Sequence, residues 1–287
     1  MSLFGFLILH YGDIRVTEKC IGSIFELAES EKCRIMIIDN DRGVKAPLSE
    51  RISKEYLSDD RVKVITVTED AGFSRANNIG YKAIKEEWKL DYLIVANNDI
   101  VFEQTSFTQL IEKSRSEYTW DILSPDIVSA DTGDHQSPIA DRARTKKEIN
   151  YTIRMNSICL KLLPVVYPIV RRMLAGAGER PYISDKKKDI VPCGACIILG
   201  GSFFEKEEEL FAPETRFYYE EYILHARCQS KGYHILYDPA IKVVHGDGKA
   251  TKKRSGNERA RIKFMLKNTL ESAKVYRKYI EDCNLFF

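Results

Sequence analysis

The first 130 residues alternate short apolar stretches with longer amphipathic ones. Residues 4–9 and 34–39 are apolar almost throughout, which predicts strands buried on both faces of a sheet. Between them, apolar residues recur at i, i+3, i+4 and i+7 over 21–28, and Thr17 is placed to cap the resulting helix. The same reasoning predicts helices over 48–57, 74–87 and 104–115, and strands over 62–67, 92–96 and 121–128.

Strands that alternate with helices of this length predict right-handed βαβ units. They therefore predict an α/β fold with a mostly parallel, twisted sheet flanked by helices. Ligands of such sheets bind at the carboxyl ends of the strands. The segments that follow the predicted strands, at 10–13, 39–42, 69–75 and 97–99, are all polar. We expect the functional site to be built from these segments.

The pattern is less regular in the second half. Residues 142–190 form a basic insertion, in which Pro164 and Pro168 interrupt an apolar stretch without a clear period. Short strands are predicted over 196–199, 234–237 and 242–245, with a helix over 219–229 closed by Gly232 and a last helix over 258–281. We expect one domain, 1–287, made of a first half (1–130), a second half (131–257) that holds the insertion, and a C-terminal helix (258–287).

The charge balance excludes some classes of partner. The 44 Lys and Arg residues against 42 Asp and Glu give 44 − 42 = +2, so no nucleic-acid partner is expected. No apolar run approaches the roughly 20 residues of a membrane span, and the first ten residues do not form a signal peptide, which favours a cytoplasmic protein. The seven scattered cysteines fit reduced thiols. Cys193 and Cys196 have the spacing of half a zinc site, but buried core thiols are the favoured interpretation.

Two strand ends carry candidate ligands. Asn97, Asn98 and Asp99 offer a carboxylate and two amides, which suit Mg²⁺ or Mn²⁺ because these ions share their coordination with substrate phosphates. Asp39 and Asn40 end an earlier strand, where a carboxylate can accept from a nucleobase imide N–H or from ribose hydroxyls. In both places a plain turn or a helix cap is the alternative.

Residues 71–80 open the helix that follows the third predicted strand. A helix N-terminus presents free N–H groups to anions, and Arg75, Asn77 and Asn78 add charge and hydrogen-bond donors. The glycine spacing is not that of a dinucleotide fingerprint, and the segment is not a phosphate loop of the Gly-Lys-Ser/Thr type.

Two later stretches suggest catalysis. Glu220 and Glu221 begin a predicted helix between aromatic residues, and one of them can act as a general base. The alternative is a pair of acids favoured by the helix dipole. His245 follows a short strand and precedes basic residues at 249–254. They fit a metal ligand and a diphosphate clamp, or else a solvated basic loop.

Taken in order, these stretches resemble the family 2 glycosyltransferases of the glycosyltransferase-A fold, especially the bacterial rhamnosyltransferase-like branch. The matching stretches are 10–11, 37–40, 71–80, 93–100, 194–196, 217–227 and 243–245. The resemblance implies a metal, Mg²⁺ or Mn²⁺, on Asp99 and His245, and a catalytic pair of Glu220 and Glu221 with Glu221 as the base. It implies donor binding by His10, Tyr11, Asp39, Asn40, Arg75, Asn77, Asn78, Asn97 and Asn98, with Asp39 reading the base.

The activity implied by the resemblance is inverting, metal-dependent transfer of a sugar from a UDP- or dTDP-type donor. The acceptor would be a glycan or a lipid-linked molecule, in bacterial surface polysaccharide synthesis, with residues 249–254 closing as a lid. Three departures keep a non-catalytic sugar-nucleotide or glycan-binding relative open: Glu221 stands for the usual Asp, Ile223 for a frequent Asp, and Gly-Asp-Gly follows His245. A sugar nucleotidyltransferase is disfavoured, because no Gly-rich basic loop follows the first strand.

The insertion has two interpretations. Residues 160–172 mix large apolar residues with Lys161, Arg171 and Arg172, a composition suited to resting on an anionic membrane surface at the inner face. A core or dimer-packing segment is the favoured alternative, because Pro164 and Pro168 are expected to break a long amphipathic helix.

Overall fold

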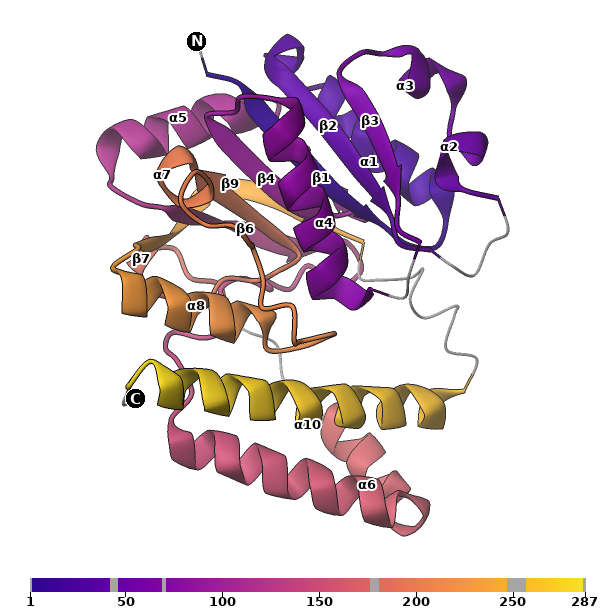
Figure 1. Ribbon diagram of the computed structural model, residues 1–287, viewed down its shortest axis with the longest axis vertical. Coiled ribbons are helices and arrows are strands. Elements are labelled where there is room, and N and C mark those ends of the chain that lie inside the picture. Colours follow the sequence, from indigo (N-terminus) through magenta and orange to yellow (C-terminus); the bar gives the residue numbers. More distant parts are fainter. Residues whose placement is uncertain (1, 42–45, 69–70, 176–180, 247–256, 286–287) are drawn as a thin grey trace.

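The computed structural model describes residues 2–41, 46–68, 71–175, 181–246 and 257–285. Figure 1 shows a central sheet with helices on both faces and a stack of helices beneath it. The strands are β1 (Phe4–His10), β2 (Cys33–Asp39), β3 (Val62–Thr66), β4 (Tyr92–Asn97), β5 (Ile100–Val101), β6 (Ile122–Ser129), β7 (Lys187–Lys188), β8 (Cys196–Gly200) and β9 (Ile235–His245). The helices are α1 (Ile14–Phe25), η1 (Ser30–Lys32), α2 (Leu48–Arg51), α3 (Lys54–Ser58), α4 (Gly72–Glu87), α5 (Phe107–Glu117), α6 (Lys146–Ala175), α7 (Gly201–Phe204), α8 (Glu220–Lys231) and α10 (Glu258–Asp282).

The described strands form one nine-stranded sheet in the order β3-β2-β1-β4-β8-β6-β9-β5, with β7 paired to β9. The strands β3, β2, β1 and β4 are parallel, as predicted. Beyond β4 the sheet is mixed, because β8 runs antiparallel to both β4 and β6. The two short strands predicted over 234–237 and 242–245 are one strand, β9, whose pairing with β6 shifts register after Pro125. The α/β fold is thus confirmed, with a mixed rather than mostly parallel second half.

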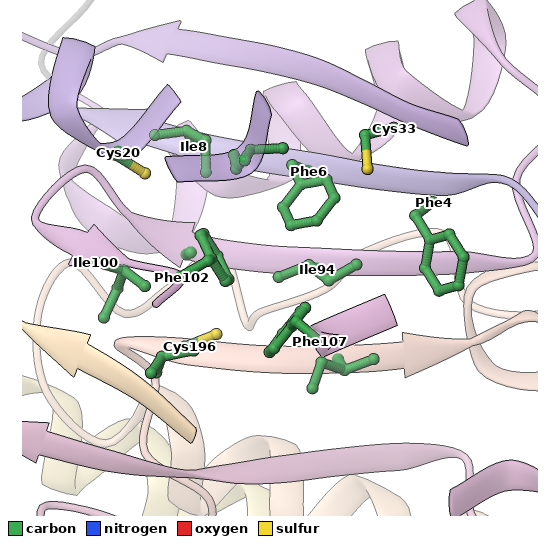
Figure 2. Close-up of a cluster of buried hydrophobic side chains, with 14 of the residues drawn as sticks. Phe4, Phe6, Ile8, Cys20, Cys33, Ile94, Ile100, Phe102, Phe107 and Cys196 are labelled. Carbon is green, nitrogen blue, oxygen red and sulfur yellow. The ribbon is translucent and has the colours of Figure 1, made fainter. Parts of the chain in front are cut away.

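The core lies on both faces of the sheet. Alternate residues of β1 point to opposite faces, so Phe6 joins one cluster and Leu7 the other, and both are fully buried. Figure 2 shows the first cluster, in which Phe6 packs edge-on against Phe102 with ring centroids 5.3 Å apart. Cys196 is buried among these side chains, which agrees with its interpretation as a core thiol.

Two local predictions in the first half are wrong. Asp13, not Thr17, caps α1 by accepting a hydrogen bond from the Arg15 N–H at 3.0 Å. Thr17 lies inside the helix and is fully buried. The predicted helix over 48–57 is two short helices, α2 and α3, because the chain becomes extended at Ile52.

Three long helices are stacked beneath the sheet in the order α8, α10, α6 (Figure 1). Tyr222 and Ile223 of α8 pack against Tyr276 of α10, and Ile149 of α6 joins the same cluster. A second cluster joins the later part of α6 to the beginning of α10. The amphipathic α10 therefore buries residues on two sides, as the middle layer of the stack.

Helix α6 contradicts the expectation that two prolines would break the insertion. It runs for 30 residues with Pro164 and Pro168 inside it. Proline removes one backbone hydrogen bond, and packing against α10 offsets that loss. Among the described residues, α6 also has a stretch, Lys146–Met173, that by length and composition alone is apolar enough to cross a membrane.

Candidate active site

The ends of three neighbouring strands lie level at one edge of the sheet. The parallel register pairs His10 with Asp39 and Leu9 with Asn97. The polar segments that follow β1, β2 and β4 therefore begin side by side, at the carboxyl edge where parallel sheets bind ligands. The register thus brings together the segments after β1, β2 and β4, and their part in the functional site stays a prediction.

Asp39 is almost fully buried at the end of β2. Its carboxylate accepts from the Leu48 N–H at 2.7 Å and from the Asp41 N–H at 3.2 Å. It thus fixes the start of α2, and a carboxylate has about four lone-pair sites, so two remain for another donor. The side chain of Asn40 instead donates to the Gly72 carbonyl at 3.2 Å, which ties the end of β2 to the start of α4.

Asn98 links the ends of β4 and β1. Its side chain donates to the Tyr11 carbonyl at 3.2 Å and to the Thr17 hydroxyl at 2.8 Å. The same hydroxyl lies 2.6 Å from His10 Nδ1. Burial lowers the pKa of His10, so its imidazole is neutral near pH 7. These contacts indicate a structural role for His10 and Asn98, which connect the end of β1 to the end of β4, where Asn97 and Asp99 lie.

Asp99 and His245 meet across the end of β9. His245 Nε2 lies 3.1 Å from Asp99 Oδ1, and both side chains are mostly buried. On its other side, His245 Nδ1 is 2.6 Å from Gln136 Oε1, an acceptor, so Nδ1 carries a hydrogen. With Nδ1 as the donor, the neutral form of the ring presents the Nε2 lone pair to the Asp99 carboxylate, and the two repel each other. Either a second proton or a cation between Nε2 and Oδ1 relieves that repulsion.

Glu221 is brought to the same region by a short backbone link. Its Oε1 accepts from the Gly194 N–H at 3.3 Å, and the next residue, Ala195, accepts from the Asn97 N–H at 2.9 Å. A Cβ on Gly194 would lie 2.6 Å from Glu221 Oε1, so only glycine allows this approach. The first turn of α8 thus lies next to the end of β4.

The neighbouring acid, Glu220, is buried. Burial, with the nearby charge of Glu221, raises the pKa of Glu220 from 4.5 to about 8, and a hydrogen bond from Ser74 opposes the rise. Tyr218 and Tyr219, just before it, have φ of 71° and 67°, a conformation that costs non-glycine residues on the order of 1 kcal/mol each. Such strain often accompanies functional sites, and here it lies directly before the buried Glu220.

The segment 71–80 makes mostly structural contacts. Arg75 donates to the Pro213 carbonyl at 3.0 Å, and Asn78 hydrogen-bonds the backbone of Leu210 and Phe211. The Asn77 side chain donates to the Phe73 carbonyl within its own helix. These contacts hold the irregular segment before Glu220 and do not support donor binding by the three residues, which stays a prediction.

Gly72 allows the start of α4 to lie close to Arg216 in the segment before Glu220. Its φ is +69°, and a Cβ there would lie 2.4 Å from Arg216 Cγ and 2.9 Å from the Arg216 carbonyl. The Phe73 N–H donates to that same carbonyl at 2.9 Å. One of the N–H groups expected to bind an anion at the start of α4 is therefore already engaged by the protein.

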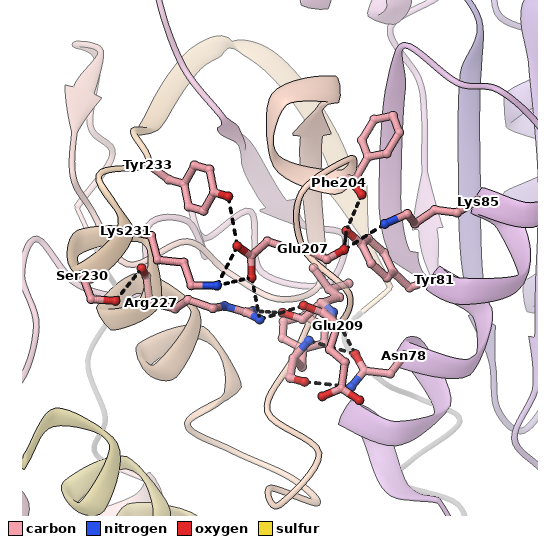
Figure 3. A network of polar contacts seen from close by, with 12 residues as sticks. Asn78, Tyr81, Lys85, Phe204, Glu207, Glu209, Arg227, Ser230, Lys231 and Tyr233 are labelled. Atoms are coloured by element: carbon pink, nitrogen blue, oxygen red, sulfur yellow. Dashed lines mark hydrogen bonds and ion pairs between the residues drawn. The ribbon is translucent and has the colours of Figure 1, made fainter. Parts of the chain in front are cut away.

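A buried carboxylate, Glu207, completes the attachment of the segment before α8 (Figure 3). Its side chain accepts from Lys231 at 2.9 Å and from the Tyr233 hydroxyl at 2.9 Å. Its carbonyl accepts from Tyr81 at 3.1 Å and from Lys85 at 2.8 Å. The network joins α4 to the end of α8 and so fixes the distance between the two helices that flank the site.

Sequence reasoning missed three residues of the site. Thr17 joins His10 to Asn98, Gln136 orients His245, and Gly194 receives Glu221. The expectation that ligands bind at the carboxyl ends of strands would have indicated Gln136, because it lies in the polar segment after β6.

The predicted lid over 249–254 lies outside the described residues. Among the described residues, no group of three or more His, Cys, Asp or Glu side chains could hold a metal ion. Asp99 and His245 are therefore considered as a pair of candidate ligands.

The family model described as glycosyl transferase family 2 matches residues 6–168, more than half of the chain. The chain therefore belongs to glycosyl transferase family 2 and is a glycosyltransferase. No curated protein matches it.

Solved structures of low identity share the fold. S. aureus TarS 1-349 gives a TM-score of 0.54 at 10% identity, over 94% of this chain and 71% of that one. Mannosyltransferase PcManGT from Pyrobaculum calidifontis, in complex with GDP-Man and Mn²⁺, gives 0.53 at 10% identity, over 98% and 75%. TarS 1-349 in complex with UDP-GlcNAc gives 0.55 at 8% identity, over 92% and 65%. These likenesses support the glycosyltransferase-A fold predicted from the sequence.

Proposed function

We propose that this glycosyltransferase moves a sugar, with inversion, from a UDP- or dTDP-type donor to a hydroxyl of a glycan or lipid-linked acceptor. The observation that supports this most is the link from Glu221 through Gly194 and Ala195 to Asn97, because it brings a carboxylate beside the edge that carries Asp99 and His245. A carboxylate that can act as a base, close to a pair of side chains that can hold a cation, is what this reaction requires.

Glu221 is the proposed base. As the acceptor oxygen forms its bond to the anomeric carbon, the bond to the diphosphate breaks and the acceptor proton passes to Glu221. Glu220, with its raised pKa, stays protonated near pH 7, so it adds no second negative charge beside the base. Asp39, with lone pairs beyond those used by Leu48 and Asp41, is the proposed acceptor of the nucleobase imide N–H.

Asp99 and His245 fit a divalent cation. The Nε2 lone pair and the carboxylate face each other at 3.1 Å, and Gln136 sets the ring orientation, as partners of metal-binding histidines do. Two protein ligands suit an ion that also binds substrate phosphates. Mg²⁺ or Mn²⁺ held there would neutralise charge on the leaving diphosphate. Similar structures were solved with GDP-Man and Mn²⁺ and with UDP-GlcNAc, which supports a nucleotide-sugar donor.

The finer assignments follow from the resemblance. We place the chain in the rhamnosyltransferase-like branch, acting in bacterial surface polysaccharide synthesis on the cytoplasmic side of the membrane. Residues 1–130 would bind the nucleotide, residues 131–257 would bind the acceptor and catalyse transfer, and 258–287 would support them. The single sheet through both halves supports one domain.

Release of nucleoside diphosphate from UDP-, dTDP- and GDP-sugars, with Mn²⁺ and a set of glycan and lipid-linked acceptors, tests the proposal. Acceptor-dependent release is expected, and Glu221→Gln should lower kcat by about 10²- to 10⁴-fold while donor binding persists. The matched control is the exposed Glu214→Gln. Donor binding without release in the wild type would instead support the non-catalytic relative, and full activity in Glu221→Gln would remove the base assignment.

A further inference from the structure

The outer face of α6 is an apolar stripe with nothing packed on it among the described residues. Its side chains are large and exposed, and the most exposed are Val165 at 79% and Met173 at 71%. The stripe consists of Tyr151, Ile158, Leu162, Val165, Ile169 and Met173. At 3.6 residues per turn these six positions fall within an arc of roughly 80°. Large exposed apolar stripes on a helix are typical of binding surfaces rather than of solvated ones.

A basic flank runs beside this stripe. Arg154, Lys161 and Arg172 are exposed, and by the same helical geometry all three lie on one side of the stripe, roughly 60–80° from its centre. None of them has a salt bridge within the described part of the chain. By contrast Arg171, which lies on another side, pairs with Glu258 of α10. No Asp or Glu occurs from residue 149 to residue 175, and Glu148, in the first turn of α6, is paired with Arg142, so no free acidic residue of α6 offsets the basic flank.

The inner face of α6 is committed to the protein. Leu163 and Val170 are buried against Ile262 and Leu266 of α10. One stretch of α6 is apolar enough to span a membrane by length and composition. In this fold, however, one face of α6 is packed on α10 and a charged flank runs along the helix, which suits a helix lying in the plane of a membrane surface rather than one crossing the bilayer.

We propose that the stripe and basic flank of α6 form a docking surface for an anionic lipid bilayer. The apolar side chains enter the headgroup region, and Arg154, Lys161 and Arg172 contact acidic headgroups from the side of the helix. Charge complementarity selects this occupant, because exposed basic side chains border the apolar stripe and no acidic residue from 149 to 175 offsets them, which suits a surface that is both apolar and anionic. Pro164 and Pro168 are exposed and lie outside the packed face, which leaves α6 attached to α10.

The surface also has a consequence that rests on the proposed function. Phe217, three residues before Glu220, packs edge-on against Phe264 of α10 with ring centroids 5.2 Å apart, and its carbonyl accepts from Ser272 at 2.8 Å. The start of the catalytic helix is therefore separated from α6 only by α10. A bilayer against the outer face of α6 would place a lipid-linked acceptor two helix layers, α6 and α10, from the start of α8, which carries Glu221.

Flotation of the full chain with vesicles tests the surface without donor or turnover, so its failure leaves glycosyl transfer untouched. Binding is expected to vesicles of phosphatidylcholine mixed with phosphatidylglycerol, weaker in high salt, and absent with phosphatidylcholine alone. Val165→Glu with Ile169→Glu should abolish flotation. Arg154→Gln, Lys161→Gln and Arg172→Gln together should weaken it about a hundredfold, at roughly fivefold for each charge.

The matched control replaces three exposed lysines of the first half, Lys19, Lys54 and Lys89, by Gln and should float like the wild type. Unchanged thermal unfolding of each variant shows that the fold is intact. Absence of flotation in the wild type overturns the proposal. So does a stripe variant that turns a dimer into a monomer without any change in flotation, since the face would then be a contact between copies of this chain.

Discussion

Glu221 Oε1 lies 3.3 Å from the Gly194 N–H, and no side chain larger than hydrogen fits between these residues. This contact joins the first turn of α8 to the turn before β8. Because Ala195 also accepts from Asn97, it sets the position of Glu221 relative to the end of β4. The position of the proposed base therefore depends on a glycine far from it in sequence.

Gly194→Ala should displace the base without unfolding the protein. A Cβ 2.6 Å from Oε1 meets the flexible end of a side chain, so the carboxylate moves rather than the backbone. Misplacement on the scale of 1 Å can cost about 10²-fold, and we expect kcat to fall by about tenfold to hundredfold while Tm changes little. Steady-state kinetics and thermal unfolding check this. Gly22→Ala, where a Cβ finds its nearest neighbour at 3.5 Å, is the control.

Glu220→Gln should stabilise the protein in a pH-dependent way. The folded protein raises the pKa of Glu220 from 4.5 to about 8, so between these values it holds a proton that the unfolded chain has lost. Wild-type stability therefore falls as pH rises through this window. The Tm advantage of Glu220→Gln should grow from pH 5 to pH 8. A constant difference, as expected for the exposed control Glu205→Gln, would contradict burial of this acid.

Glu207→Gln should weaken the fold rather than the chemistry. The substitution leaves Arg227, whose side chain is only 12% exposed, without its carboxylate partner. Removing one member of a buried ion pair costs about 3 kcal/mol. Urea unfolding measures the loss. The neighbouring exposed Glu208→Gln should cost almost nothing, and equal effects in the two variants would mean that the network in Figure 3 does not support the fold.

Gln136→Met should weaken metal binding through His245. The amide oxygen orients the imidazole at 2.6 Å, and loss of such a partner typically costs about 10- to 100-fold in metal affinity. Calorimetric titration of Mn²⁺ in the presence of UDP or dTDP measures this directly. Gln109→Met, on the exposed face of α5, is the control. Unchanged affinity in Gln136→Met would contradict the role of Gln136 in orienting His245 for a metal.

The parallel strands of the first half and the long helices between them could be predicted from sequence because each has one clear period. Residues 92–96 are apolar and buried on both faces, as predicted. Helix α6 could not be predicted, because it has three different faces: one packed on α10, one apolar and exposed, and one basic. Its apolar residues therefore surround most of the helix and mask the period, while its two prolines suggest a break.

The candidate site could also be predicted only in part from the sequence. Asp39, Asn97 and Asp99 were found by a rule on strand ends, which depends only on local sequence and sheet type. Asn78 was assigned to the donor because it begins a helix, yet its side chain holds Leu210 and Phe211, more than 130 residues away. Long-range contacts of this kind have no signature in a single sequence.

Metal-dependent nucleotide binding is the most direct test of the account, because it requires the strand ends to act together. Calorimetry of UDP and dTDP binding, with and without Mn²⁺, should give binding that requires the metal in the wild type. Asp99→Asn should lose it, whereas the exposed control Asp60→Asn should not. Equal binding by Asp99→Asn and the wild type, or no binding of any nucleotide, would contradict the proposed site.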